Sequence, residues 1–189
     1  MKRILVMVLT AVLVACAHSP QQVTINPVLS MSGDPYGNNR PVNVAVDDRR
    51  ESKSIGSRGG VYSETSVITI QNDLDQAILA AAKGKLAVLG FNVNSAIADA
   101  TAMTIVIDDI SYQPINTSIG NNIEVQAVMQ AELQSQGETF TARYTSKVQR
   151  QTVMAPDEED NSEMLSELIS KTMNRMFADP ELKAFLSNI

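Results

Sequence analysis

The chain has little of what most catalytic sites use. Its 189 residues include one cysteine, one histidine and no tryptophan, whereas thiol or imidazole catalysis and structural zinc sites draw on two or more such groups. Basic residues are also few, because 15 Lys and Arg stand against 21 Asp and Glu and leave a net charge of −6. This balance argues against a partner bound through its phosphates, such as a nucleic acid. At this length one compact domain is expected.

The N-terminal segment has the pattern of a secretory signal peptide. Lys2 and Arg3 are positively charged, and residues 4–15 are apolar apart from Thr10, as in the n-region and h-region of such leaders. The apolar run is shorter than the roughly 20 residues that cross a bilayer as a helix. No later run approaches that length, so no transmembrane segment is predicted. We assign residues 1–15 to a signal peptide.

The end of this leader resembles the lipobox of bacterial lipoproteins, in the sequence Leu13-Val14-Ala15-Cys16. The resemblance implies that the leader is cut before Cys16 and that this cysteine is acylated. Two or more acyl chains hold a protein firmly on a membrane. Ala17 stands where an Asp would resemble an inner-membrane retention signal, so we expect a protein anchored on the periplasmic side of the outer membrane. The alternative is an ordinary secretory leader with no lipid attached to Cys16.

The next segment differs from the rest of the chain in composition. Residues 16–40 contain three of the seven prolines and few apolar residues, which is typical of a tether. A short first strand is expected near residues 22–25. We assign residues 16–40 to the acylated cysteine and its tether, and residues 41–189 to a single periplasmic α+β domain.

Alternating apolar and polar residues predict strands in this domain. They are expected over residues 42–46, 61–67, 102–113, 122–135 and 138–150. The last two are joined by the turn Gln136-Gly137 and form an antiparallel hairpin with one buried face. That face carries, on the first of the two strands, Ile123, Val125, Ala127, Met129, Ala131 and Leu133. Residues 55–60 are expected to be a glycine-rich loop.

Two longer segments have helical periodicity. The first covers residues 70–89, with Thr69 as its N-cap and Gly90 as its stop. The second begins at Asp160 with a pattern like a capping box, and a short helix over residues 182–186 closes the chain. The predicted fold class is α+β, a two-layer sandwich in which a small, mainly antiparallel sheet carries two amphipathic helices packed on one face.

The most site-like cluster of side chains is basic. Arg49 and Arg50 follow the strand that ends in Asp47-Asp48, and Arg58 lies in the glycine-rich loop. Arginines beside loop N–H groups bind carboxylates and phosphates, so these three residues are candidate contacts for a ligand or partner. The alternative is that they form ion pairs at the end of the strand with no ligand role.

Other chemistry is weakly indicated. Asp108 and Asp109 are neighbours on a predicted strand and point to opposite faces, and the run 157–160 lacks the spaced ligands and the glycine of a calcium loop. No metal or other cofactor is predicted. Ser52 and Lys53 are adjacent, which suits a catalytic dyad poorly because neighbouring side chains on extended chain diverge. An enzymatic role is therefore not predicted.

The order of these motifs resembles the YajG-like family of uncharacterised proteobacterial outer-membrane lipoproteins. The resemblance rests on the lipobox at Cys16, on the strand over residues 42–50 with the loop 55–60, and on the helix that ends in Gly90-Phe91. It implies an envelope lipoprotein and brings no catalytic residue with it.

These observations favour a non-catalytic role in envelope assembly or homeostasis. The expected partners are the membrane, through the acyl chains, and an envelope protein or peptidoglycan. The alternative is a binding module for a small anionic envelope ligand, such as a peptidoglycan fragment, that uses Arg49, Arg50 and Arg58. A protein partner is expected at an exposed edge strand or at the polar sheet face of Gln126, Gln130, Gln134, Arg143 and Lys147. Met164, Met173 and Met176 form either a partner surface or part of the core.

Overall fold

The computed structural model describes residues 19–59, 63–93, 97, 99–116, 121–152 and 154–188. The predicted leader, the acylation site at Cys16 and part of the glycine-rich loop (residues 60–62) lie outside the described residues. Over the described ranges the fold is α+β, as predicted from the sequence, with one seven-stranded sheet and three α-helices. The strands are β1 (Gln21–Val23), β2 (Val42–Asp48), β3 (Ser54–Ser57), β4 (Val67–Ile70), β5 (Thr101–Asn116), β6 (Asn121–Ser135) and β7 (Glu138–Thr152). The helices are α2 (Leu74–Val88), α3 (Glu158–Phe177) and α4 (Pro180–Asn188).

Strand β5 is a central strand of the sheet, with paired strands on both of its sides. The order is β1-β4-β3-β5-β6-β7, and β2 joins the same edge of β5 as β3. The hairpin of β6 and β7 is antiparallel as expected, but β2 runs parallel to β5 and β1 runs parallel to β4. The sheet is therefore larger and more mixed than the small, mainly antiparallel sheet predicted. Parallel neighbours need a long connection and not a hairpin, and here β3, β4 and α2 lie between β2 and β5 in the chain, whereas β2 and β3 lie between β1 and β4.

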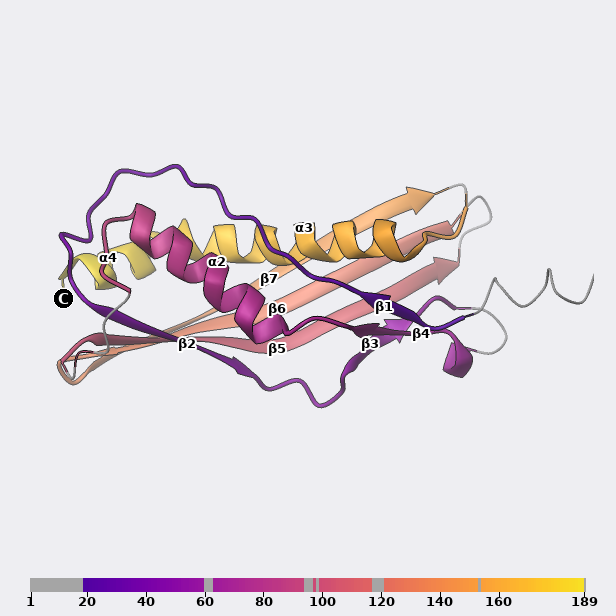
Figure 1. The fold of residues 1–189 in the computed structure, drawn as a ribbon, viewed down its shortest axis with the longest axis horizontal. Helices are drawn as coiled ribbons and strands as arrows, with labels where there is room; N and C mark the ends of the chain where they lie inside the picture. The colour runs from indigo at the N-terminus through magenta and orange to yellow at the C-terminus, as the bar shows by residue number, and fades with distance from the viewer. Residues whose placement is uncertain are drawn as a thin grey trace, which may run out of the picture.

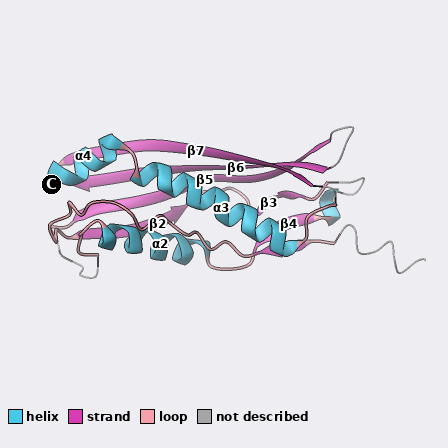
Figure 2. Ribbon diagram, turned by 90° about the horizontal axis from the view of Figure 1, so that it is seen from above, coloured by secondary structure: helices cyan, strands magenta, loops and turns pink. Residues whose placement is uncertain are grey.

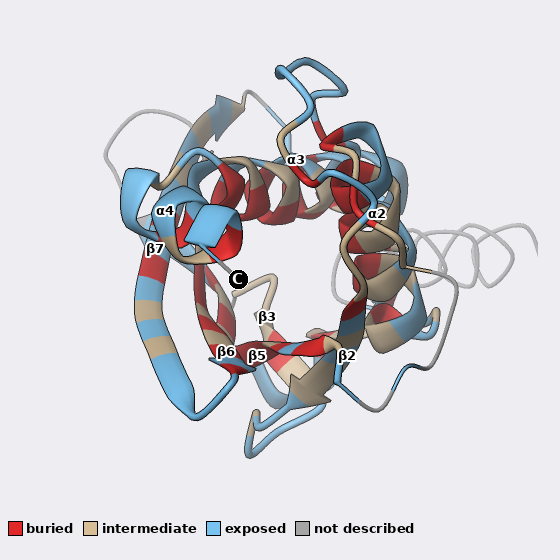
Figure 3. Cartoon of the chain, turned by 90° about the vertical axis from the view of Figure 1, so that its left-hand side faces the viewer, coloured by how far each residue is buried: buried red, intermediate tan, exposed pale blue. Residues whose placement is uncertain are grey.

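The core lies between the sheet and the helices. Figure 1 shows the helices on one side of the strands, and the end-on view in Figure 3 shows a curved sheet whose buried residues face α2 and α3. The predicted apolar face of β6 is confirmed, because all six of its residues are buried. The three methionines of α3, Met164, Met173 and Met176, are also fully buried, so they belong to the core and do not form a partner surface.

Helix α2 begins later than its periodicity predicts. The expected N-cap, Thr69, lies in β4, which pairs with β1 and β3 on its two sides. Sheet pairing takes these residues, and Asp73 caps the helix instead, with its carboxylate accepting from the Gln76 N–H at 3.0 Å. The predicted stop is confirmed, because Gly90 adopts a φ of +87°.

Two further boundaries differ from their predictions. Helix α3 starts at Glu158, because Asp157 and Asp160 form a capping box three residues before the predicted one. In the glycine-rich loop, residues 54–57 form β3. Gly56 makes this possible, since a Cβ at that position would lie 2.1 Å from the carbonyl oxygen of Tyr112 on β5. Of the predicted strand over residues 61–67, the described part is a short 3-10 helix followed by the start of β4.

The segment before β2 is bound to the domain, although its composition is typical of a tether. We call residues 24–30 the strap, because they run extended beside α3 (Figure 1). Four alternate N–H groups of the strap donate to side-chain oxygens spaced four residues apart on α3, which we call the serine ladder. The donors are Thr24, Asn26, Val28 and Ser30, and the acceptors, in the same order, are Ser162, Ser166, Ser170 and Asn174, at 3.1, 3.0, 2.9 and 3.0 Å.

The spacing of the N–H donors along the strap matches the spacing of the oxygen acceptors along α3. Four residues of α-helix rise about 6 Å, and two residues of extended chain advance about 6.6 Å. Ser162, Ser166 and Ser170 each donate their own hydroxyl proton to the carbonyl four residues earlier, which leaves a lone pair for the strap. On the inner side, Ile25 and Leu29 are buried in the core. The folded domain therefore begins at β1, about twenty residues before the predicted boundary at residue 41.

The opposite flank of α3 covers the edge strand β7. Lys171 donates to the Lys147 carbonyl at 3.2 Å, and Arg175 donates to the carbonyl of Thr145. Arg150 of β7 pairs with Glu163 and Glu167 of the helix. Charged side chains over exposed carbonyls protect an edge strand from pairing with other chains.

Removing part of the serine ladder should loosen the strap. We expect the double variant S166A/S170A to lose about 1 kcal/mol of unfolding free energy in urea, because two strap N–H groups lose their acceptors. Alanine is the better helix former, so S187A, whose serine lies outside the ladder, should be neutral or slightly stabilising. Equal stability of the double variant and S187A would show that the ladder does not hold the strap.

Candidate functional site

The structure separates the three predicted arginines. Arg49 lies on the outer face of the sheet, Arg50 lines a pocket at the N-terminal end of α2, and Arg58 lies beside the loop that leads into α3. Their side chains do not line one common pocket among the described residues. The three-arginine ligand site that the sequence suggests is therefore not assembled, and each residue has to be considered by itself.

Arg49 and Arg58 are held by the protein. Arg49 bonds Asp47 at 2.7 Å and Glu132 of β6 at 2.9 Å, in contact with solvent. The hydrogen bonds to these two carboxylates raise the pKa of the Arg49 guanidinium. Arg58 donates to the carbonyl oxygen of Pro156 at 3.2 Å and so ties β3 to the loop before α3. For these two residues the ion-pair and loop-holding interpretation fits.

Arg50 differs from the other two. It lines a pocket of about 390 Å³ together with Asp48, Lys53 and the first residues of α2. Its Nε and Nη2 bond Asp48 at 2.8 and 2.7 Å, and its side chain is 9% exposed. Its buried Nη1 has no hydrogen-bond partner among the described residues, and an unpaired buried donor is costly. Among the described residues, this is the only buried nitrogen of the three arginines that has no hydrogen-bond partner.

Carboxylates dominate the charge of this pocket. Asp48 has a lowered pKa because Arg50 bonds its ionised form. Asp75 has a raised pKa, first through burial and then through repulsion by Asp48 and Asp73. With Arg50 and Lys53 opposite, the pocket presents both signs of charge. It suits a ligand group that carries an ammonium beside a carboxylate better than a simple anion.

The neighbouring strand β2 has an open edge. Its odd-numbered residues bond β5, since the Thr101 N–H donates to the Pro41 carbonyl and the Arg49 N–H donates to the Ile107 carbonyl. The even-numbered residues point their N–H and C=O groups to the other side, where Val42 bonds Asn92 at 2.9 Å. Beyond this bond, no strand of the described chain pairs with β2 on that side. The edge runs past Val44 and Val46 to the Arg50 pocket.

The polar face of the sheet is internally paired. A register shift in β5 follows Ile107, and Asp108 accepts from Gln130 at 2.5 Å and pairs with Arg143 at 3.4 Å. Further along, Glu124 accepts from Lys147 and Gln149. Three residues of this predicted partner surface, Gln130, Arg143 and Lys147, are thus engaged in cross-strand pairs. In the described residues no three Asp, Glu, His or Cys side chains form a group that could hold a metal ion.

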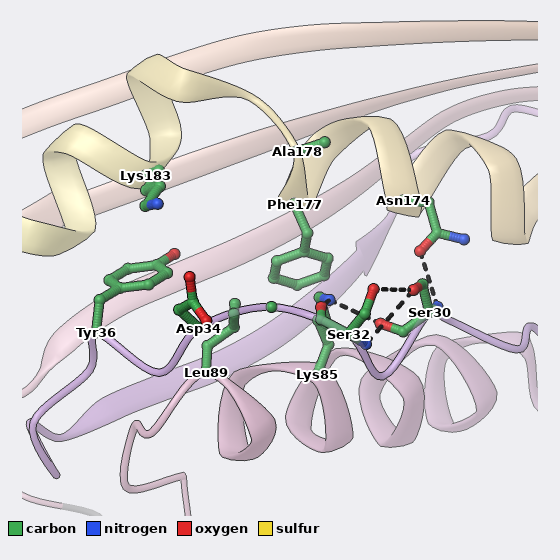
Figure 4. A pocket seen from close by; sticks show the side chains of 11 residues that line it. Ser30, Ser32, Asp34, Tyr36, Lys85, Leu89, Asn174, Phe177, Ala178 and Lys183 are labelled. Carbon is green, nitrogen blue, oxygen red and sulfur yellow. Dashed lines mark hydrogen bonds between the residues drawn. The ribbon is translucent and has the colours of Figure 1, made fainter.

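A second pocket lies at the C-terminal ends of α2 and α3 and was not predicted from the sequence. It has a volume of about 430 Å³, and Figure 4 shows Asp34, Tyr36 and Lys183 at one end and Lys85 with Ser30 and Ser32 at the other. Lys85 is buried, and its Nζ donates to the carbonyl oxygens of Ser30 and Ser32, both at 2.7 Å. The Lys85 ammonium therefore bonds the end of the strap and the residues after it to α2.

The junction of α3 and α4 is fixed near this pocket. Tyr144 of β7 donates its hydroxyl proton to the Asp179 carboxylate at 2.6 Å. Asp179 also accepts from the Glu181 N–H at the start of α4. The hydrogen bond from Tyr144 is the first cause of the lowered pKa of Asp179, and burial is the first cause of the raised pKa of Tyr144.

Comparison with known proteins identifies the family. A family model described as "Uncharacterized lipoprotein" matches residues 27–187. The chain belongs to this lipoprotein family. The family predicted from the sequence is thereby confirmed, and the match begins inside the strap.

The other comparisons identify no function for this lipoprotein. No curated protein matches it. A solved structure described as "Crystal structure of uncharacterized protein" is similar with a TM-score of 0.48 at 11% identity, covering 85% of this chain and 99% of that chain. That likeness is too distant to support an argument about function.

The bond between Tyr144 and Asp179 should make the lipoprotein's stability depend on pH. The folded-state pKa of Asp179 is lowered, so its contribution is present above the unfolded value of 3.8 and is lost as pH falls through the folded value. At pH 7 we expect Y144F to unfold with about 1 kcal/mol less free energy, since solvent reaches Asp179. The difference from the parent should shrink in urea titrations below pH 4. A difference independent of pH would contradict this assignment.

Proposed function

We propose that this lipoprotein is acylated at Cys16, is held on the periplasmic side of the outer membrane, and acts without catalysis in envelope assembly or homeostasis by binding another envelope protein. The lipobox and the family support the lipid anchor. None of the helices in the described part of the chain is both long and apolar enough to span a bilayer. The chain's one thiol and one imidazole, Cys16 and His18, both precede the folded domain, which supports the non-catalytic role.

The open edge of β2 carries the proposal of a protein partner. An extended segment that adds to this edge would bond the N–H and C=O groups of Val44 and Val46, as in strand addition. The opposite end of the sheet differs, because side chains of α3 cover the carbonyls of β7. Of these two edges, β2 is therefore the one left for a partner.

The Arg50 pocket supports a second candidate function. A small charged envelope ligand, such as a peptidoglycan fragment, would place a carboxylate beside Arg50 and Lys53 and an ammonium near Asp73 and Asp75. This function would need Arg50, whereas strand addition would need the backbone of β2. A direct comparison of R50Q with a β2 variant therefore separates the two.

The anchor is tested by replacing its cysteine. We expect C16S to leave the membrane fraction, because the acyl chains supply the binding energy. Labelling with a radioactive fatty acid should mark the parent and not the variant. Membrane retention and labelling of C16S would contradict acylation at this residue.

The partner edge is tested by proline. In V46P the lost N–H faces the open edge, so the bonds to β5 remain, but a strand can no longer pair there. With a photo-crosslinking residue at Ala45 in intact cells, we expect one reproducible protein adduct that V46P abolishes and V46I retains. Thermal unfolding checks that both variants fold.

Two results would count against strand addition. An adduct that persists in V46P would show that the edge is not the binding site. Loss of the adduct in R50Q, with V46P unaffected, would favour the Arg50 pocket and the ligand-binding function.

A further inference from the structure

We propose that the end of the domain where α3 begins rests on the lipid surface, with Met154 and Ile115 entering the headgroup region. This inference rests on the acylation of Cys16 proposed above. It concerns the orientation of the domain and the lipid contact, which the anchor by itself does not fix.

The segment between Cys16 and β1 is short. Because the domain begins at Gln21 in β1, only residues 16–20 separate the acylated cysteine from the fold. Five residues span at most about 18 Å when fully extended. A tether of 25 residues, as the composition indicates, would have reached several times farther. The start of β1 is therefore confined close to the membrane.

The loop between β7 and α3 lies beside the start of β1. The Gln21 side chain donates to the Pro156 carbonyl oxygen at 3.3 Å and accepts from Asn161 Nδ2 at 2.7 Å. Arg58 donates to the same carbonyl. The loop between β7 and α3 is thus bonded directly to the residue at which the tether attaches. Figure 1 shows β1, the end of β7 and the start of α3 toward one end of the elongated molecule, and Figure 2 shows the end of β7 and the start of α3 on the same side as β4, the partner of β1.

Two apolar side chains are exposed at this end of the molecule. Met154, two residues before Pro156, is 79% exposed, and Ile115 at the end of β5 is 38% exposed. Asn122 of β6 pairs with Ile115 on one side and with Gln151 of β7 on the other, so both apolar residues lie at the same end of the sheet. Exposed apolar side chains beside a lipid attachment point fit the interfacial region of a bilayer.

The charges at this end decide which lipids fit. The capping run of α3, residues 157–160, carries four carboxylates, which outnumber the one guanidinium beside them, that of Arg58 at Pro156. An acidic rim repels anionic headgroups, so the contact should be apolar and shallow and should favour zwitterionic lipid.

The opposite end then points away from the membrane. Strand β5 alone, with 16 residues, spans about 50 Å. The pocket of Lys85 and Lys183 lies at that far end, and Met31 packs near it against Gly84 of α2. Met31 is 57% exposed, which makes it a matched control for Met154.

Because the chain contains no tryptophan, a single introduced tryptophan reports on one site. The acylated variants M154W and M31W are reconstituted into phosphatidylcholine vesicles that contain lipid brominated near the headgroup. We expect M154W to be quenched and blue-shifted, and M31W to behave as it does in solution. Partial replacement by phosphatidylglycerol should reduce the quenching of M154W.

Co-flotation with the vesicles distinguishes the proposed orientation of the domain from the lipid anchor on which it rests. If the acylated variants float and M154W is quenched no more than M31W, the proposed orientation is wrong while the anchor stands. If neither variant floats after acylation, the anchor itself fails. Greater quenching of M31W than of M154W would place the opposite end on the membrane and overturn the inference.

Discussion

The hydrogen bonds between the strap and the serine ladder of α3 hold the segment after β1 against the domain. They work because two residues of extended chain and four residues of helix advance by nearly the same distance. Through them a segment with a tether-like composition becomes part of the fold, with Ile25 and Leu29 in the core. Five residues, 16–20, separate the proposed lipid anchor at Cys16 from β1, and that length limits how far the domain can lie from the membrane.

The two edge strands β7 and β2 differ in how far other parts of the chain cover their backbone N–H and C=O groups. Along β7, Lys171 and Arg175 of α3 bond the outward carbonyls, so this edge is occupied from within the chain. Along β2, the described residues supply a strand partner only near Val42. An unprotected edge is a liability unless it serves a purpose. The contrast between the two edges is the physical basis for assigning an interaction role to β2.

Much of the fold could be predicted from local patterns. The alternation on β6 and the stop at Gly90 depend on residues close together in sequence, and both are confirmed. The strap could not be predicted in this way, because its partners lie about 140 residues away. A signal was present in the serines at positions 162, 166 and 170, which share one helix flank. The separation of the three arginines could not be predicted for a related reason, since Arg50 and Arg58 are near in sequence but bond different elements.

Amide hydrogen exchange along the strap tests the central claim most directly. If the serine ladder holds this segment, the N–H groups of Thr24, Asn26, Val28 and Ser30 should exchange far more slowly than an unstructured peptide. Their protection should fall in parallel when α3 is destabilised. Exchange at the rate of free chain throughout residues 24–30 would show that the serine ladder does not hold this segment, and only the pairing of β1 with β4 would then join the N-terminal part of the chain to the domain.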